Sequence, residues 1–408
     1  MKVIKLVFIT ACLLFFEKEA VSQSKMKLDD VIKISIENNQ SIKSSKFNIE
    51  KEKAINLKSF NIPKPELFIE YEGVQGSLSN ADSRKIGILQ MIEFPTNYFL
   101  RSDVQESQIK VAEEELNSSV NSLRTNVKLN YYNLLLLNEL LKTSKENYRI
   151  YEDFLFTAEK KYEAGESSNL EVLGARVNKI KFENEIKNLE SEIKTSQSEI
   201  RTLMNVDYDV TPVEEISYTE VRLNKTELLT KAINNNPELK MLNFQKEKFS
   251  NKISLSKGEL LPDISFKYFK QKLLGNDNYW GMEVGLGIPL WFWWQQSGNI
   301  KESNYEYKIA SSEEAGFRKT LENEINKTFE EYENSLRQVK FFNEEALKET
   351  EEILRQAKKS YEEGEIGYVE YLQALNLAYE TRTQYLNSIY NFNQSIIKLE
   401  KLTSGDLK

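Results

Sequence analysis

The stretch KYEAGESSNLEVLGAR, residues 161–176, returns in altered form as SYEEGEIGYVEYLQAL, residues 360–375. Aligned without gaps, the two stretches agree at seven of sixteen positions: Tyr162/Tyr361, Glu163/Glu362, Gly165/Gly364, Glu166/Glu365, Glu171/Glu370, Leu173/Leu372 and Ala175/Ala374. In each copy a glycine separates two runs with helical spacing, which is typical of a helix that ends at a left-handed residue. The chain is therefore predicted to build the same helical hairpin twice.

The similarity between the two halves extends beyond these turns. Residues 36–42 match residues 233–239, and residues 65–71 match residues 262–268, both at an offset of 197. A nearly constant offset indicates an internal duplication, and two copies are too few for a solenoid array. The predicted domains are a signal peptide (1–23), a first structural repeat (24–205), an inter-repeat linker (206–225) and a second structural repeat (226–408).

The first residues have the pattern of an export signal. Lys2 and Lys5 precede an apolar run at 6–16, and small residues follow at 20–22. The run is too short to span a bilayer as a helix. Residues 9–12 also resemble a lipoprotein cleavage box, so lipidation of Cys12 stays an alternative. In either case the mature protein is expected to be exported.

Each repeat is predicted to contain a helix, two strands, a very long helix and a helix of medium length. The predicted helices are 28–58, 100–163 and 170–203, then 226–257, 301–363 and 369–402; the predicted strands are 66–74, 84–93, 263–273 and 279–288. Apolar residues recur three or four positions apart along the long helices, as at Leu116, Val120, Leu123 and Val127. Such a narrow stripe is typical of coiled-coil packing.

The strands suggest where the protein resides. Residues 279–288, YWGMEVGLGI, alternate between apolar side chains and small or polar ones over ten residues, as transmembrane β-strands do. Residues 85–94 show a weaker alternation. The corresponding apolar sets in the other two strands are Leu67, Ile69 and Tyr71, and Ile264, Phe266 and Tyr268. A sheet edge cannot face lipid, and membrane barrels have at least about eight strands, so four strands predict a barrel shared between chains.

Aromatic residues follow both strand pairs. Tyr98 and Phe99 follow the first pair, and Trp291, Phe292, Trp293 and Trp294 follow the second. Amphipathic aromatic side chains gather where a bilayer meets water, so these residues are predicted to form a membrane aromatic belt. The alternative is a core cluster where strand meets helix.

With these features assembled, the sequence resembles the TolC-type outer membrane factors over nearly all of the mature chain. The resemblance rests on the duplicated Y-x-x-G-x7-L-x-A motif and on three further segments at 236–239, 261–264 and 287–291. Residues 89–95, LQMIEFP, look most like the branch that serves cation and metal efflux, although Thr96 replaces the usual glycine.

The resemblance implies a mainly α fold with a membrane β part. Antiparallel coiled-coil helices would form an α-barrel tunnel through the periplasm, and four strands per chain would join a twelve-stranded β-barrel in the outer membrane of a Gram-negative bacterium. The implied partners are two further copies in a homotrimer, a periplasmic adaptor (membrane fusion) protein, an inner membrane efflux transporter and outer membrane lipid. The implied function is a passive exit duct for small solutes such as metal cations or drugs.

The resemblance also implies roles for the turn residues. The positions expected at the periplasmic tip, in contact with the adaptor, are Tyr162, Gly165, Leu173, Tyr361, Gly364 and Leu372. Glu171 and Glu370 are candidates for a gate at the tunnel mouth, where three chains would bring six carboxylates together. The alternatives are a plain hairpin turn, and an acidic helix start favoured by the helix dipole. Ser168 and Glu171 are predicted to form a capping box, and Ile366 stands where some family members have arginine.

Composition narrows the remaining functions. The chain has no histidine, one cysteine and a net charge of −8, and it shows no phosphate-binding loop or nucleophile–base pair. An enzyme, a cofactor, a metal site and a nucleic-acid partner are therefore not expected. Two alternatives to an efflux duct stay open: the exit duct of a type I secretion system, and a periplasmic coiled-coil scaffold that does not transport.

Overall fold

A computed structural model describes residues 23–290 and 294–407. The signal peptide predicted before Gln23, with Cys12, lies outside these residues, as do Trp291, Phe292 and Trp293 of the predicted aromatic belt. The described residues divide into two compact units. One lies within 1–40, 120–232 and 323–408, and the other consists of 41–119 and 233–322, so each unit draws on both repeats.

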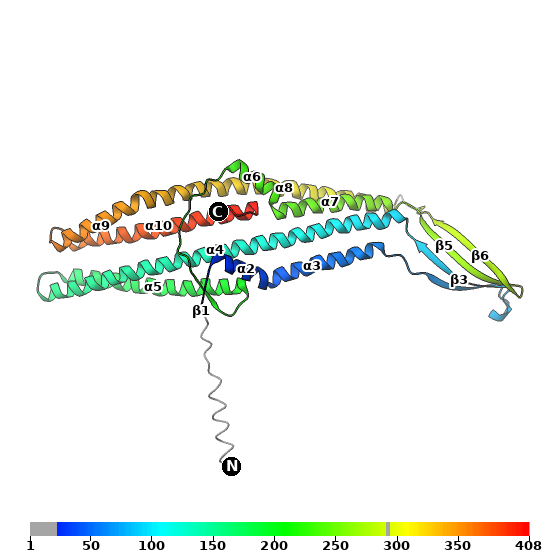
Figure 1. The fold of residues 1–408 in the computed structure, drawn as a ribbon, viewed down its shortest axis with the longest axis horizontal. Coiled ribbons are helices and arrows are strands. Elements are labelled where there is room, and N and C mark those ends of the chain that lie inside the picture. The colour runs from blue at the N-terminus through cyan, green and yellow to red at the C-terminus, as the bar shows by residue number, and fades with distance from the viewer. Residues whose placement is uncertain (1–22, 291–293, 408) are drawn as a thin grey trace, which may run out of the picture. The chain divides into compact units, whose positions relative to one another are not determined.

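Long helices dominate the chain (Figure 1). Those of the first repeat are α2 (Leu28–Asn38), α3 (Gln40–Asn56), α4 (Pro95–Glu163) and α5 (Asn169–Met204); those of the second are α6 (Lys225–Asn235), α7 (Pro237–Gly258), α8 (Gln295–Phe341), α9 (Leu347–Glu362) and α10 (Tyr368–Thr403). Short 3₁₀ turns lie at η1 (Leu57–Phe60) and η2 (Leu78–Asn80). The predicted combination of long helices with a four-stranded sheet is confirmed.

Two helices predicted as continuous are broken at matching positions. The helix predicted over 28–58 is interrupted at Asn39, and the one over 226–257 at Asn236, and both residues have extended ψ angles of 124° and 119°. Pro237 explains the second break, because proline lacks an N–H and disfavours helical backbone in the residue before it. The Asn236 side chain then accepts a hydrogen bond of 3.0 Å from the Leu239 N–H and caps α7.

The helix predicted over 301–363 is interrupted too. A π-helix, η3 (Phe342–Ala346), separates α8 from α9. By contrast α4 continues for 69 residues and begins earlier than predicted, at Pro95. Proline suits the first turn of a helix, where its missing N–H costs nothing.

The larger sheet is antiparallel, with strand order β2 (Glu66–Glu72), β3 (Ser83–Ile92), β5 (Asp263–Leu273) and β6 (Asn276–Gly287). The central pair, β3 and β5, joins the two repeats through ten paired residues, from Ser83 opposite Leu273 to Ile92 opposite Ile264. The four predicted strands thus lie in one sheet, with β2 and β6 at its edges.

A second sheet was not predicted from the sequence. β1 (Gln23–Met26) pairs in parallel with β4 (Asp209–Pro212), which lies within the predicted linker. Each strand has four residues, too few for an alternation to be recognised. The Tyr131 hydroxyl donates to the Met26 carbonyl at 2.9 Å and also to the Glu214 carboxylate, so a buried side chain of α4 holds this segment.

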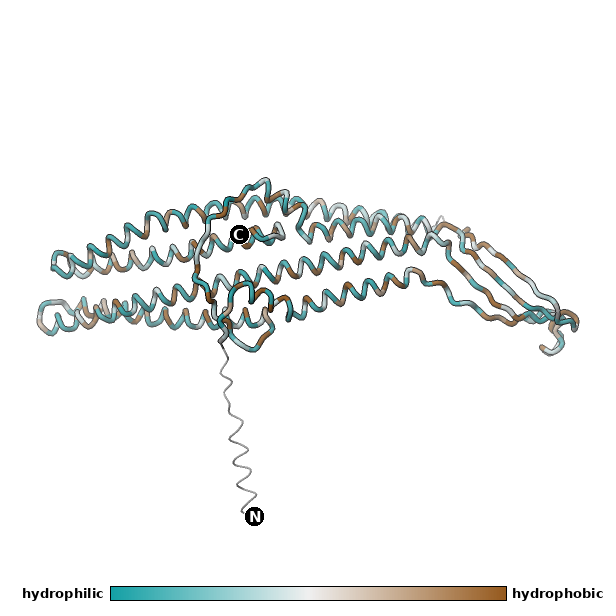
Figure 2. Tube along the Cα trace, viewed as in Figure 1, coloured by the Kyte–Doolittle hydropathy of each residue, from teal (hydrophilic) through white to brown (hydrophobic). Residues whose placement is uncertain are grey.

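The helices pack through interrupted apolar stripes. Figure 2 shows hydrophobic and hydrophilic residues interchanging every few positions along them. Buried residues such as Val127, Leu134 and Ile200 form the core of the first unit. Among the described residues, no helix is both long and apolar enough to cross a membrane.

Candidate functional site

The two duplicated turns have one backbone geometry. Gly165 and Gly364 adopt left-handed φ angles of 77° and 76°. In the first turn the Glu166 N–H donates to the Lys161 carbonyl at 2.8 Å and the Gly165 N–H to the Tyr162 carbonyl at 3.0 Å; the second turn repeats both bonds at 2.8 and 3.2 Å. This pair of bonds defines the Schellman motif, so the predicted glycine caps are confirmed.

The capping box predicted at Ser168 and Glu171 is wrong. Ser168 is the N-cap of α5, but its side chain makes no capping hydrogen bond. The Glu171 carboxylate instead accepts a hydrogen bond of 2.7 Å from the Tyr361 hydroxyl, in the second hairpin. A bond from a half-buried phenol to a charged carboxylate is stronger than a bond to an exposed backbone N–H, which water can satisfy. Glu171 therefore joins the two hairpins.

Tyr361 lies at the junction of the hairpins. Its ring stacks on Tyr371 at 5.0 Å with an interplanar angle of 5°, and the Lys161 ammonium lies 5.0 Å from its centroid. Burial and the neighbouring Glu171 carboxylate both raise the pKa of Tyr361. The phenol therefore stays protonated, and able to donate, throughout the physiological pH range.

An aromatic cluster lies directly behind this junction. Phe154 of α4 contacts three tyrosines of the second hairpin, at centroid distances of 4.8 Å for Tyr368, 5.8 Å for Tyr361 and 6.1 Å for Tyr371. Burial, followed by the charge of Glu171, raises the pKa of Tyr368 to about 12. Stacked and tilted rings at these distances add to the stability that burial gives.

The cluster continues along the hairpins. Phe182 of α5 lies 5.3 Å from Tyr151 and 4.9 Å from Tyr379, and the Tyr151 hydroxyl donates to Asn376 Oδ1 at 3.2 Å. The sequence interpretation did not single out Phe182 or Phe154. Their helical spacing was a usable signal, but it does not say which rings meet across hairpins.

The structure separates the predicted tip residues into two groups. Tyr361 and Leu372 pack against the aromatic cluster. Tyr162 and Leu173, at the matching positions of the first hairpin, are 49% and 47% exposed. The gate candidates differ as well, because Glu171 is bonded to Tyr361 whereas Glu370 is exposed.

One face of α5 carries an exposed apolar stripe. It consists of Leu170, Leu173, Val177 and Ile180, spaced three and four residues apart. Next to it, Arg176 pairs with Glu159 of α4 at 2.8 Å. This spacing suits packing against another helix.

The larger sheet exposes its apolar face and partly buries its charged face, which is the reverse of the arrangement in a protein surrounded by water. Apolar residues lie in register on one face and are exposed: Leu67, Ile69, Ile86, Ile88, Phe266, Tyr268, Met282, Val284 and Leu286. Arg84, Lys270 and Lys272 also lie on this exposed face, at its end near Leu273. The other, half-buried face carries charged residues that pair with one another. There the Lys85 ammonium contacts Glu70 at 3.0 Å and Glu72 at 2.7 Å. Lys267 contacts Glu70 at 3.7 Å, so the charges neutralise one another across strands.

The predicted aromatic belt is divided between exposed and buried positions. Phe99 is 61% exposed and Trp294 is 73% exposed. Tyr98 is only 6% exposed, and it stacks on Phe60 at 6.4 Å. Within the single chain Tyr98 thus takes the core role that was the alternative interpretation.

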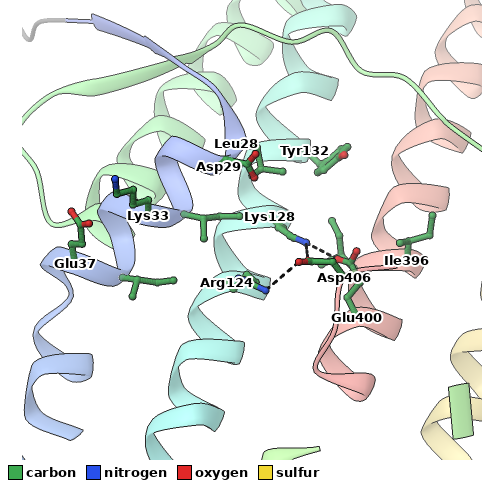
Figure 3. Close-up of a pocket in the computed structure, with 13 residues that line it drawn as sticks. Leu28, Asp29, Lys33, Glu37, Arg124, Lys128, Tyr132, Ile396, Glu400 and Asp406 are labelled. Carbon is green, nitrogen blue, oxygen red and sulfur yellow. Dashed lines mark hydrogen bonds and ion pairs between the residues drawn. The ribbon is translucent and has the colours of Figure 1, made fainter. Parts of the chain in front are cut away.

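A cleft of about 610 Å³ lies between α2, α4 and the end of α10 (Figure 3). Lys128 on its wall contacts Glu400 at 2.8 Å and Asp406 at 2.9 Å, and Arg124 contacts Asp406 at 3.5 Å. Burial lowers the pKa of Lys128 because it disfavours the charged ammonium. Hydrogen bonds and charges from Glu400 and Asp406 outweigh this effect, so the pKa of Lys128 is raised. These charges bind one another and fasten the end of α10 to α4.

Comparison with known proteins agrees with this geometry. The sequence profile of the family described as "Outer membrane efflux protein" matches residues 74–206 and 228–405. No curated protein sequence matches the chain.

Solved structures share the fold at low sequence identity. A membrane protein from Pseudomonas aeruginosa has a TM-score of 0.78 at 15% identity, over 93% of this chain and 90% of that protein. The outer membrane protein VceC from Vibrio cholerae has a TM-score of 0.75 at 14% identity, over 93% and 97%. The outer membrane channel MtrE from Neisseria gonorrhoeae, in its open state, has a TM-score of 0.76 at 16% identity, over 94% and 90%.

Proposed function

The chain belongs to the outer membrane efflux protein family, and we propose that it is the exit duct of a tripartite efflux system for small solutes such as metal cations or drugs. As a member of this family it is a channel protein rather than an enzyme. It resides in the outer membrane of a Gram-negative cell and extends into the periplasm.

The observation that carries the proposal is the inverted burial of the larger sheet. Met282 is 69% exposed on the apolar face, whereas the Lys85 side chain on the charged face is only 17% exposed. An exposed apolar surface of this extent marks a lipid or protein contact. Apolar-out and polar-in alternation is the pattern of strands that line an aqueous passage through a bilayer.

The edges of the sheet support assembly with further copies. β2 and β6 each pair on one side only within the described chain. Unpaired backbone groups are very costly in lipid, so another chain must pair with each edge. Three copies would close a twelve-stranded barrel, which is the homotrimer that we propose.

The two hairpin turns would form the periplasmic tip of the duct. The exposed stripe at Leu170, Leu173, Val177 and Ile180 is suited to helical hairpins of a periplasmic adaptor. An inner membrane transporter would supply energy and cargo through that adaptor. Glu171 and Glu370 would give the mouth six carboxylates, with Tyr361 restraining Glu171 in the resting state.

One substitution placed on each face of the sheet tests the proposal. Met282→Lys puts a charge on the apolar face, where lysine costs about 2–4 kcal/mol near the middle of a bilayer. Met91→Lys is the matched control, because Met91 lies opposite Ser265 on the other face. We expect the wild type and Met91→Lys to yield heat-sensitive trimers in outer membranes and channels in planar bilayers, and Met282→Lys to lose both. Equal behaviour of the two variants would contradict a lipid-facing sheet.

The gate is tested by ion selectivity. The double variant Glu171→Gln, Glu370→Gln removes all six proposed carboxylates, and we expect the preference of the channel for K⁺ over Cl⁻ to fall. An unchanged preference would show that these carboxylates do not line the mouth.

Cargo is tested in cells. A deletion strain exposed to metals, dyes and antibiotics should become sensitive to the exported class. Loss of a secreted polypeptide with unchanged sensitivity would favour the type I secretion duct. A non-transporting scaffold has no need of a lipid-facing sheet, so the inverted burial disfavours it.

A further inference from the structure

The charged face of the larger sheet carries a row in which phenylalanine and glycine alternate from strand to strand. Phe68 of β2 pairs with Gly87 of β3, Gly87 with Phe269 of β5, and Phe269 with Gly281 of β6. The row therefore crosses all four strands at one level of the sheet.

Each ring occupies the space that the neighbouring glycine leaves empty. A Cβ atom at Gly281 would lie 2.4 Å from Cζ of Phe269 and 2.9–3.0 Å from both Cε atoms. A Cβ atom at Gly87 would lie 2.7 Å from Cζ of Phe68, and it would also lie 2.3 Å from the Tyr268 carbonyl oxygen. The rings thus lie along the sheet. A side chain at Gly281 would force the Phe269 ring to rise from it, whereas one at Gly87 would also displace the backbone of β5.

Lysines of the same face cover the rings. The Lys267 ammonium lies 4.6 Å from the centroid of Phe68 and 5.9 Å from that of Phe269, and Lys85 lies 5.8 Å from Phe269. Carboxylates hold both ammonium groups, with Glu72 2.7 Å from Lys85 and Glu283 3.9 Å from Lys267. Each ring is enclosed between glycine backbone and a cation, which favours the flat position.

We propose that this row sets the width of the barrel lumen at its level, and so the size of solute that the barrel admits. The inference rests on the proposed function, in which the charged face lines the lumen of a barrel. Gly281 and Gly87 keep the rings against the wall. Three copies would place six flat rings on the wall of the lumen, so small changes at the glycines narrow the passage from several sides.

Gly281→Val tests the proposal, because valine suits a strand and its side chain requires the space of the Phe269 ring. Gly287→Val is the matched control on the same face of β6, where a Cβ atom would meet only Asp263 atoms at 3.7 Å or more. Phe269→Ala in the Gly281→Val background is the rescue. The readout is the largest polyethylene glycol that lowers the conductance of bilayer channels when added to the barrel side alone.

We expect the Gly281→Val channel to exclude the largest polymers that the wild type and Gly287→Val admit, and the rescue to admit them again. The proposal would be overturned if the size limit for polymers were unchanged in Gly281→Val, or if Gly287→Val lowered that size limit equally. If Gly281→Val does not assemble, Phe269→Ala alone should raise the limit, and no rise would overturn it. A wild-type protein that forms no channel would instead overturn the proposed function.

Discussion

The two helical hairpins, α4 with α5 and α9 with α10, have turns of the same backbone geometry, but equivalent side chains lie in different surroundings. The Schellman bonds are the same in both. Tyr361 enters the aromatic cluster, whereas its counterpart Tyr162 is exposed; Glu171 is bonded across the hairpins, whereas its counterpart Glu370 is exposed. A duplicated motif therefore fixes the backbone turn, and the neighbouring hairpin decides which copy of each side chain makes contacts across the hairpins.

The helices that lead into the two turns differ as well. α4 is continuous past a run of buried leucines, 134–137. In the second repeat η3 separates α8 from α9, and both of these helices make hydroxyl contacts with α10, Ser335 to Ser395 at 3.3 Å and Thr350 to Thr381 at 3.4 Å. Nearby, the buried Thr383 hydroxyl has no hydrogen-bond partner among the described residues.

The strongest test of the comparison removes the ring that joins the hairpins. Phe154→Ala deletes a buried side chain that contacts three tyrosines of the second hairpin, and we expect it to lower the free energy of unfolding by about 3–5 kcal/mol. Urea unfolding of the detergent-solubilised protein measures this loss. Phe156→Ala is the control, because Phe156 is exposed on the same helix and should change stability little. Equal losses in both variants would contradict a joining role for Phe154.

A smaller effect is expected at the turn glycines. Gly165→Ala and Gly364→Ala should each cost about 1–2 kcal/mol, because alanine is strained at a positive φ. No atom within 4 Å would meet the added methyl group at either position, so the two costs should be equal. Gly316→Ala, in the interior of α8 and also without neighbours, should instead stabilise the protein. Clearly unequal losses at the two turns would show that their surroundings differ more than their geometry does.

The hydrogen bond between the hairpins can be removed without changing the packing. Tyr361→Phe keeps the ring but deletes the donor to Glu171, and we expect a loss of about 1 kcal/mol. Tyr162→Phe, at the matching exposed position, should have no measurable effect on thermal unfolding. If both variants melt like the wild type, water replaces the hydroxyl at Glu171 and the bond does not stabilise the packing of the two hairpins.

The smallest effect, the contribution of the raised pKa of Tyr361 to stability, changes only at high pH. The folded pKa of Tyr361 lies above the value of about 10 for an unfolded tyrosine, since burial and Glu171 both raise it. Its contribution to stability is therefore complete below pH 10 and is lost as the pH rises above that value. Absorbance at 295 nm should show one fewer late-titrating tyrosine in Tyr361→Phe than in the wild type. Identical titration curves would contradict the raised pKa.

Local signals made much of the fold predictable. Strand alternation and the turn glycines each act within a few residues, so the sequence was enough to place the four strands and both hairpins. The helix breaks at Asn39 and at η3 carry no comparable local signal, and they were missed. The strands β1 and β4 were missed because four residues have no periodicity to read.

The candidate site was less predictable than the fold. The sequence marked Glu171 and Tyr361 separately, but their bond joins residues 190 positions apart. The roles of Phe154 and Phe182 likewise depend on which helix faces they meet. An internal repeat predicts which positions of the two halves are equivalent, but it does not predict which residues are in contact.

By itself the sequence determined the duplication, the turn geometry and the alternation that turns an apolar face outward, because each depends on backbone angles or on spacing along one element. Only the tertiary structure decided that Tyr361 rather than Tyr162 packs against the aromatic cluster, and that Phe68, Gly87, Phe269 and Gly281 form one row. The reason is register. Contacts between elements depend on how strands and helices are aligned with one another, and the pattern within any single element leaves that alignment open.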